Sequence, residues 1–415
     1  MVKAEIGAGA GAGAGADADA VAVADAIHPP WLHLLSAFLA MEPSDSLISI
    51  SRDCGGGAIT ESVQNFIWDQ CISRADGKAS APYVRSFLKK VILEIESAGA
   101  VVADELYEQF AFNMTSSKGD DLAKGDSRII RKISFLYPSD HVEAQVCQSL
   151  RKLIVPLQCS LNMLEGDTGC SIWPSSLFLS EFILSCPELF SMKSCFELGS
   201  GVGLVGICLA HVKPSKVLLT DGDLSTLANL KVNLELNCMS TRFCSSEGIL
   251  EDPNKVKCLH LPWESALESD LRDLMPDIVL GADVIYDPEC IPHLVRVIAT
   301  LLTTKKSTSI RRDGFGVPND ISGNTQVKNS NASSTDIVNK RYEEFLLAST
   351  TQPVAYIASV VRNIDTFNYF LKVALEANLR VVDITQNVKI FDFLPYMRSY
   401  QRSSVRLLGI YHSFH

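Results

Sequence analysis

The stretch Ser194–Asp223 constrains the fold of this chain more than any other, because it reads as strand, glycine turn, helix and strand. A first apolar run leads to Glu197, and glycines follow at positions 199, 201, 203 and 206. A second apolar run, 216–220, ends at Asp221. This pattern is half of a doubly wound α/β sheet, in which a ligand binds where the strand ends meet the glycine turn.

The acidic residues around the turn indicate which ligand it binds. A helix N-terminus attracts phosphate, so a carboxylate at Glu197 disfavours a phosphate-bearing ligand. S-adenosylmethionine fits, since its amino group and sulfonium are cationic and Asp221 would bind its ribose hydroxyls, as an acidic residue does in NAD sites. Two alternatives stay open. One is an ordinary strand–helix turn, and the other is a nicotinamide cofactor, because the glycines also satisfy G-x-G-x-x-G.

Composition narrows the class of protein. With 415 residues the chain has room for two or three domains, and a net charge of −11 without a long basic run disfavours a general nucleic-acid binder. Its 12 cysteines include no C-x-x-C pair and its histidines do not cluster, which disfavours a metal site and favours free thiols in a reducing compartment. No stretch reaches the ~20 apolar residues of a membrane span. The N-terminus lacks the charged and apolar parts of a secretory signal, so we expect a cytoplasmic location.

Three regions follow one another along the chain. Residues 1–27 are Gly/Ala-rich and are expected to be disordered. Residues 28–128 are expected to form a helical module, with helices starting at Pro29, after Thr60 and near Pro82, and a further helix at 104–112. Helix packing explains its apolar stripes, and the alternative is a surface that docks a protein substrate.

Residues 129–415 are expected to form the α/β domain. Strands are predicted at 133–137 and 153–164, and a helix at 176–184 precedes the glycine turn. Beyond Asp221 the pattern alternates helix 224–237, strand 256–261, helix 266–274, strand 277–283, helix 288–302, strand 354–362 and helix 365–377, before two last strands near 381–383 and 404–411. Such alternation predicts a parallel sheet covered on both faces, completed by a final hairpin. The polar stretch at about 303–340 is expected to be a disordered insertion.

Four side chains near predicted strand ends are candidates for the chemistry. If the acceptor is a lysine amine, it is mostly protonated at neutral pH, and Asp283 could orient its ammonium group while Tyr286 lines the channel or hydrogen-bonds the amine. Positioning would then supply most of the rate. Trp173 and Trp263 could each flank an adenine or methionine group with an apolar face. The structural alternatives are helix capping for Asp283 and packing for the three aromatic rings.

Taken together, the motifs resemble the seven-β-strand protein-lysine methyltransferases. The segments that carry the resemblance are Ile172-Trp173-Pro174, FELGSGVGLVG, TDGD, Trp263 and Ala282-Asp283-Val284-Ile285-Tyr286, the last of which contains the D-x-x-Y motif of this family. Within the family, segments 83–88, 104–108 and 361–363 are most similar to the members that methylate a lysine of eukaryotic elongation factor 2. Pro262, the 303–340 insertion and the Gly/Ala leader depart from the family pattern.

The resemblance implies a seven-stranded, Rossmann-like class I methyltransferase fold with S-adenosylmethionine as cofactor. It implies catalytic roles for Asp283 and Tyr286 and cofactor contacts at Trp173, Gly199, Ser200, Gly201, Asp221, Trp263 and Ala282, to which the glycine turn itself adds Glu197 and Gly203. We therefore expect a protein-lysine N-methyltransferase acting on elongation factor 2, with no metal, nucleic acid or membrane partner. The alternatives are a nicotinamide-dependent oxidoreductase and a non-catalytic adaptor that keeps the fold.

Overall fold

The computed structural model describes residues 29–75, 77–116, 128–137, 152–160, 168–239, 256–303 and 334–413. The chain divides into two compact units: residues up to Ser171 together with Phe391–Gln401 form unit 1, and Ile172–Ile390 with the residues from Arg402 onward form unit 2. The expected leader at 1–27 lies outside the described residues. Within the described ranges, no helix combines the length and apolar character needed to cross a membrane.

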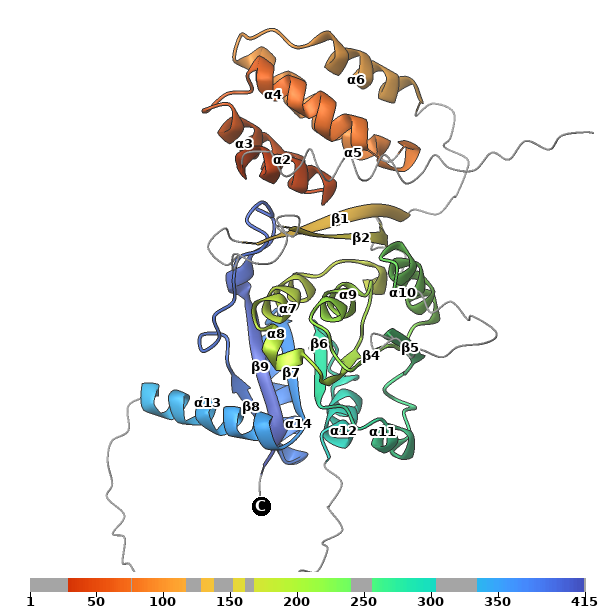
Figure 1. Ribbon diagram of the computed structural model, residues 1–415, viewed down its shortest axis with the longest axis vertical. Helices are drawn as coiled ribbons and strands as arrows, with labels where there is room; N and C mark the ends of the chain where they lie inside the picture. Colours follow the sequence, from red (N-terminus) through yellow and green to blue (C-terminus); the bar gives the residue numbers. More distant parts are fainter. Residues whose placement is uncertain are drawn as a thin grey trace, which may run out of the picture. The chain divides into compact units, whose positions relative to one another are not determined.

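Unit 1 contains the predicted helical module (Figure 1). Its helices are α2 (Pro29–Leu39), α3 (Ser44–Cys54), α4 (Glu61–Phe66), the short turns η1 (Ile67–Cys71) and η2 (Ile72–Arg74), α5 (Gly77–Ser97) and α6 (Asp104–Ser116). Sequence reasoning missed α3, because the alternating apolar residues of its LISIS run resemble a strand. Pro82 lies inside α5 rather than at its start.

The strands β1 (Arg128–Leu136) and β2 (Lys152–Ser160) form an antiparallel sheet of their own in unit 1. The segment Phe391–Gln401 packs here, where the Leu136 amide donates to the Phe393 carbonyl at 2.8 Å and the Ser134 amide donates to the Tyr396 hydroxyl at 2.8 Å. The contacts therefore divide the chain at Ile172, whereas the sequence predicts a domain boundary at 128/129. The difference arises because β1 and β2 bury apolar side chains within unit 1 instead of extending the large sheet.

Unit 2 is built on a seven-stranded sheet in the order β5-β4-β3-β6-β7-β9-β8. Its strands are β3 (Ser194–Leu198), β4 (Lys216–Asp221), β5 (Val256–His260), β6 (Ile278–Ala282), β7 (Val354–Val360), β8 (Leu379–Asp383) and β9 (Val405–His412). The strands from β5 to β7 are parallel, and β9 runs antiparallel to both β7 and β8. The predicted parallel sheet with a final hairpin is confirmed.

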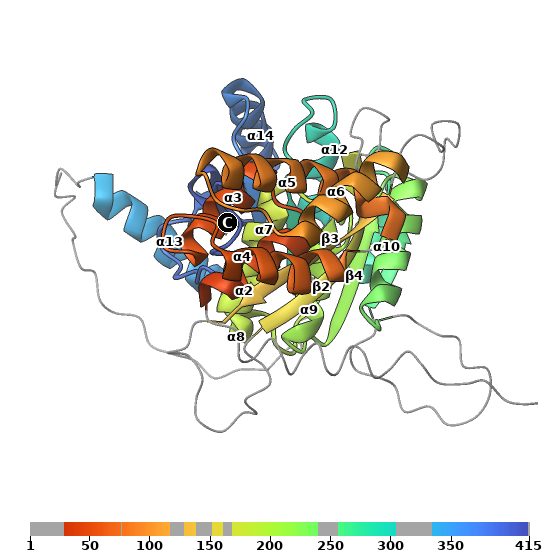
Figure 2. The ribbon, with the colours of Figure 1, turned by 90° about the horizontal axis from the view of Figure 1, so that it is seen from above.

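Helices cover both faces of this sheet. They are α7 (Pro174–Ser185), α8 (Pro187–Phe190), α9 (Leu204–His211), α10 (Leu224–Leu236), α11 (Glu268–Leu274), α12 (Ile291–Leu301), α13 (Ser334–Thr351) and α14 (Ile364–Glu376), with two short turns, η5 (Thr168–Cys170) in unit 1 and η6 (Arg402–Ser404) in unit 2. Figure 2 shows α12 and α14 on one side of β3 and β4, and α8 and α9 on the other. Buried apolar side chains of the sheet, including Phe196, Val279 and Ile357, pack with those of α12 and α14 into one core.

Helix α13 revises the predicted insertion. Residues 304–333 lie outside the described residues, but α13 begins at Ser334, inside the stretch expected to be disordered up to about 340. The helix is anchored by Phe345, which is 1% exposed and packs edge-on against Tyr356 of β7 at a centroid distance of 5.7 Å. Burial of this ring explains why the polar stretch ends in a helix.

The register of the parallel strands brings the candidate residues to one edge. Leu198 of β3 pairs with Gly281 of β6, and Ala282 of β6 pairs with Ala358 of β7, so the turns after β3, β6 and β7 leave the sheet side by side. After β3 the chain adds β4 and β5 on one side of this strand, and then returns to add β6 and β7 on its other side. The strand order therefore reverses between β3 and β6, which is the topological switch point. Ligands of open α/β sheets bind in the crevice outside the carboxyl ends of the strands at this point.

Candidate functional site

The glycine turn after β3 has a backbone that only glycine adopts readily. Gly199, Gly201 and Gly203 have φ values of 60°, 53° and 86°, all in the left-handed region. A Cβ atom on Gly203 would lie 2.2 Å from Leu230 Cδ1, and one on Gly206 would lie 2.4 Å from Leu219 Cδ2. The first three glycines thus shape the turn, and Gly206 lets α9 pack closely on β4.

Ser200 fixes the turn to β4 rather than facing a ligand. Its amide donates to the Thr220 carbonyl at 2.8 Å, and its Oγ accepts the Thr220 amide at 3.0 Å. The Thr220 hydroxyl in turn donates to the Glu197 carbonyl at 2.7 Å. Ser200 is 6% exposed, and its carbonyl also accepts the Gly203 amide at 2.8 Å, so its backbone and side chain both hold the turn. A cofactor contact at Ser200 stays a prediction.

Asp221 ties the end of β4 to the same turn. One carboxylate oxygen accepts the Gly201 amide at 3.1 Å, and the other accepts the Asp223 amide at 3.1 Å. Burial raises the pKa of Asp221, while these backbone hydrogen bonds lower it. The carboxylate is only part-buried, so its remaining lone pairs can accept hydrogen bonds from a ligand.

Glu197 is buried directly beneath the turn. It is 2% exposed, and its Oε2 atom has no hydrogen-bond partner. Burial raises the pKa of Glu197 to about 8, which the Ser200 side chain partly offsets by hydrogen bonding. A buried acceptor left unpaired costs stability, and such groups mark places where another group can bind.

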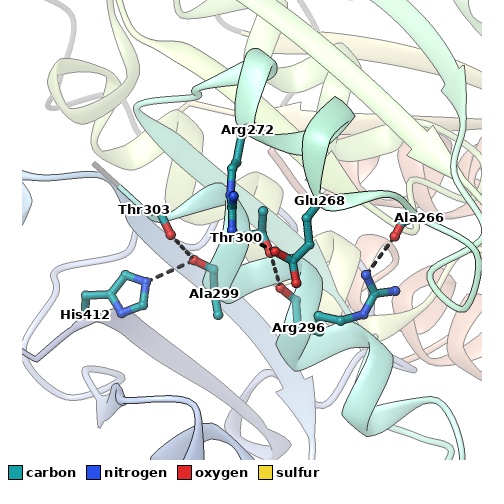
Figure 3. Close-up of polar contacts among 8 residues, drawn as sticks. All are labelled: Ala266, Glu268, Arg272, Arg296, Ala299, Thr300, Thr303 and His412. Atoms are coloured by element: carbon teal, nitrogen blue, oxygen red, sulfur yellow. Dashed lines mark hydrogen bonds and ion pairs between the residues drawn. The ribbon is translucent and has the colours of Figure 1, made fainter. Parts of the chain in front are cut away.

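Trp263 lies against the glycine turn and is held from behind by Arg296. A Cβ atom on Gly199 would lie 3.6 Å from Trp263 Cζ2 and 3.1 Å from Val284 Cγ1, so the ring contacts the turn backbone. The Arg296 guanidinium, on α12, donates to the Trp263 carbonyl at 2.6 Å. It also donates to the Ala266 carbonyl at 2.7 Å, as Figure 3 shows. One side chain therefore fixes the whole loop after β5.

Asp283, the first residue after β6, has both its backbone and its carboxylate bound. Its φ is 60°, an uncommon value for a residue other than glycine. Its amide donates to the Ala358 carbonyl of β7 at 2.8 Å. Arg362 donates to its two carboxylate oxygens at 2.9 and 2.6 Å, and the Asp283 side chain is only 5% exposed. Hydrogen bonding to Asp283 raises the pKa of Arg362.

The same guanidinium contacts Trp173. The Arg362 Cζ atom lies 5.3 Å from the centroid of the Trp173 ring, within the range of a cation–π interaction. Trp173 precedes Pro174 at the N-terminus of α7, and its carbonyl accepts the Ser176 hydroxyl at 2.7 Å. The turn that carries Trp173 is thus tied to the end of β7.

Tyr286 is the most exposed of the predicted site residues. Its side chain is 63% exposed. Partial burial of the hydroxyl raises the pKa of Tyr286, and the nearby groups Cys290, Asp287, Asp221 and Glu264 raise it further. The phenol therefore keeps its proton at neutral pH and can donate a hydrogen bond.

The structure brings the predicted residues together at the carboxyl edge of the sheet, although they play unequal parts. Glu197, Asp221, Asp283 and the Trp263 ring surround or underlie the glycine turn and its neighbour strands, with Ala282 as the last residue of β6. Sequence reasoning missed the roles of Arg362 and Arg296. The signal for Arg362 was its place at the end of a predicted strand, where side chains face the crevice. Nothing in the sequence near Arg296 indicated that it bonds the carbonyls of Trp263 and Ala266.

Residues 155–312 match the model of a protein family described as lysine methyltransferase. The matched span contains every site residue predicted from the sequence and the D-x-x-Y motif. This region is therefore similar to lysine methyltransferases, as the motifs led us to expect, and its seven-stranded sheet has the predicted Rossmann-like arrangement.

Curated relatives agree with the family match. The human protein-lysine N-methyltransferase EEF2KMT is 30% identical over 228 residues, which cover 55% of this chain and 62% of the human protein. The calmodulin-lysine N-methyltransferase of Arabidopsis thaliana is 34% identical over 137 residues, which cover 33% of this chain and 41% of that protein. The chain thus spans less than two thirds of the length of these relatives.

Proposed function

We propose that this protein transfers a methyl group from S-adenosylmethionine to the side-chain amine of a lysine in a second protein. We propose elongation factor 2 as that substrate. The observation that carries the proposal is the lysine methyltransferase match, whose span includes the glycine turn and the ends of β4 and β6. Support for the substrate comes from the relatives named EEF2KMT, which include the human, bovine and mouse proteins.

The residues of the turn fit this cofactor. The unpaired Oε2 of Glu197 offers a buried acceptor for a cationic amino group, and a nearby cation would favour the ionised form of this carboxyl. Gly199 lacks the Cβ that would crowd Val284 at 3.1 Å, so the glycine turn can lie close to the segment after β6. Asp221 would bind the ribose hydroxyls. When bound, S-adenosylmethionine supplies a methyl carbon made electrophilic by the attached positive sulfur.

The residues after β6 fit a lysine amine. The Asp283 carboxylate, already paired with Arg362, keeps further lone pairs that can accept from an ammonium group at its narrow exposed edge. The Tyr286 hydroxyl, on a residue that is 63% exposed, can orient the amine once the amine has lost its proton. Catalysis would come mainly from holding the amine in line with the methyl group.

Two other functions are less well supported. A nicotinamide-dependent oxidoreductase would have to bind the pyrophosphate of its cofactor at the glycine turn, close to the buried carboxyl of Glu197, and an ionised carboxylate there would repel it. A non-catalytic adaptor would have no need for the Asp283–Arg362 pair at the crevice. The family match favours the methyltransferase over both.

Radiolabelled methyl transfer tests the proposal. The purified protein is incubated with labelled S-adenosylmethionine and, in separate reactions, with elongation factor 2 and with calmodulin. We expect label on elongation factor 2 alone, on a lysine identified by mass spectrometry, and no label with Asp283→Asn. Label on calmodulin alone would overturn the substrate but keep the activity, and no label on any protein of a cell extract would overturn the activity.

We also propose a cytoplasmic location, where elongation factor 2 acts. The ten cysteines of the described residues are all free, as is usual in a reducing compartment. Imaging of a fluorescently tagged full chain tests this, and enrichment in an organelle or at the cell surface would contradict it.

A further inference from the structure

We propose that Arg362 is a positioning residue of the methyl-transfer site, which fixes the Asp283 carboxylate with its guanidinium fork and supports the Trp173 ring through a cation–π contact. This inference rests on the proposed function. Its basis is the single guanidinium that contacts both a residue predicted to orient the lysine and a residue predicted to contact the cofactor.

The fork determines where the Asp283 carboxylate points. Two parallel hydrogen bonds of 2.9 and 2.6 Å join the two carboxylate oxygens to different nitrogens of Arg362. A bidentate pair of this kind sets the plane of the carboxylate as well as its position. Since the Asp283 side chain is 5% exposed and Arg362 is 47% exposed, the arginine is the part of the pair that reaches the surface.

The backbone gives Asp283 little freedom to compensate for a lost partner. Its left-handed conformation, with φ at 60°, costs free energy and persists only where surrounding contacts stabilise it. Those surroundings are β7 and its end: Ala358 accepts the Asp283 amide at 2.8 Å, and Arg362 holds the carboxylate. The end of β7 therefore determines how the carboxylate that follows β6 is oriented.

The contact with Trp173 carries the second role. The Arg362 Cζ atom lies 5.3 Å from the Trp173 ring centroid, at the turn that starts α7. Lysine would keep the positive charge but would lose the fork and the delocalised guanidinium beside the ring. A residue needed only for its charge would tolerate lysine, whereas a positioning residue of this geometry would not.

The chain contains a matched control. Arg406 pairs with Asp383 at 3.6 Å and lies 5.9 Å from the Phe367 ring, so it repeats the arrangement of carboxylate, guanidinium and aromatic ring in the same unit. Asp383 ends β8, and neither residue lies at the β3/β6 switch point. Arg406→Lys removes a guanidinium that lies beside a carboxylate and an aromatic ring, in a single ion pair that involves no residue of the site.

The test compares Arg362→Lys, Arg362→Gln and Arg406→Lys in the full chain. We expect both Arg362 variants to lose on the order of 10–100-fold in kcat on elongation factor 2, while Arg406→Lys stays near the wild type. The dissociation constant of S-adenosylhomocysteine, which needs no methyl acceptor, should rise about threefold in the Arg362 variants through the loss of support for Trp173. Wild-type kcat and affinity in Arg362→Lys would overturn the inference.

A double-mutant cycle separates positioning from general destabilisation. If Arg362 acts through Asp283, the double variant Asp283→Asn/Arg362→Gln should have a kcat within about threefold of Asp283→Asn alone, because coupled residues are not additive. If the two losses multiply, Arg362 does not act through Asp283 and the inference fails. A wild-type protein that binds no S-adenosylhomocysteine would instead overturn the proposed function, which is a separate result.

Discussion

The β3–β4 side of the site is held together by bonds between residues close in sequence, whereas the β6–β7 side depends on a pair far apart. The Asp221 carboxylate accepts a hydrogen bond of 3.1 Å from the Gly201 amide, 20 residues away in the sequence and within a single strand–helix–strand unit. The Asp283 carboxylate accepts a hydrogen bond of 2.6 Å from Arg362, which lies 79 residues away at the end of the neighbouring strand. The β3–β4 side is therefore determined by local backbone geometry, whereas the β6–β7 side depends on a side-chain pair that forms only in the folded protein.

The largest effect is expected on the β6–β7 side. Asp283→Asn should lower methyl transfer on the order of 1,000-fold, since it removes the charge that orients the amine. It should leave the affinity for S-adenosylhomocysteine within about threefold, because the β3–β4 side is untouched. Asp383→Asn, which alters another aspartate at a strand end, is the control. If Asp283→Asn lowered the affinity for S-adenosylhomocysteine as much as the rate of methyl transfer, the β3–β4 and β6–β7 sides would not have separate roles.

Gly203→Ala should destabilise the β3–β4 side most. The added Cβ would lie 2.2 Å from Leu230 Cδ1 and would stand at a φ of 86°, so overpacking adds to backbone strain. We expect a loss of about 3 kcal/mol in the free energy of unfolding. Gly199→Ala, whose Cβ would lie 3.1 Å from its nearest neighbour, should lose about 1 kcal/mol in the same denaturant titration. Similar losses of unfolding free energy in the two variants would show that Leu230 moves aside and relieves the clash in Gly203→Ala.

Asp221→Asn should act on cofactor affinity rather than on rate. Loss of a charged hydrogen bond to the ribose predicts about a tenfold rise in the dissociation constant for S-adenosylhomocysteine. The kcat at saturating cofactor should stay near the wild type. Asp277→Asn is the matched control, because its carboxylate also accepts a backbone amide, that of Ser194 at 2.7 Å, but at the opposite edge of the sheet. A large fall in kcat would contradict the division of labour between the two sides.

Glu197→Gln should change how stability depends on pH. Because burial raises the pKa of Glu197 to about 8 in the folded protein, against 4.5 for the free group, the contribution of its protonated form to stability is fully present below pH 4.5 and is lost as the pH rises towards 8. Glutamine does not titrate. The difference between the two free energies of unfolding should therefore shift in favour of the variant by about 1 kcal/mol per pH unit between pH 5.5 and 7.5. A constant difference over this range would show that Glu197 is ionised in the folded protein.

The sequence predicted the β3–β4 side well because its determinants are local. Glycines at fixed spacing and an acidic residue at each strand end define the turn, and the alternation from 224 to 377 placed the helices and strands of the sheet within a few residues. The final hairpin of β8 and β9 was also predicted. Each of these features depends on periodicity and turn residues that a short window of sequence contains.

The sequence did not predict features that depend on tertiary contacts. The pairing of Arg362 with Asp283, and the hold of Arg296 on the Trp263 loop, follow from strand register and helix packing rather than from spacing. The strands at 128–136 and 152–160 were assigned to the main domain because composition does not reveal which sheet a strand joins. The helix α3 was missed because burial against its neighbours overrides an alternating pattern.

Calorimetric titration of the purified wild-type chain with S-adenosylhomocysteine, and separately with NADH, determines which cofactor the glycine turn binds. We expect saturable binding of one S-adenosylhomocysteine per chain, weakened about tenfold by Asp221→Asn, and no binding of NADH. Binding of NADH without binding of S-adenosylhomocysteine would contradict this expectation.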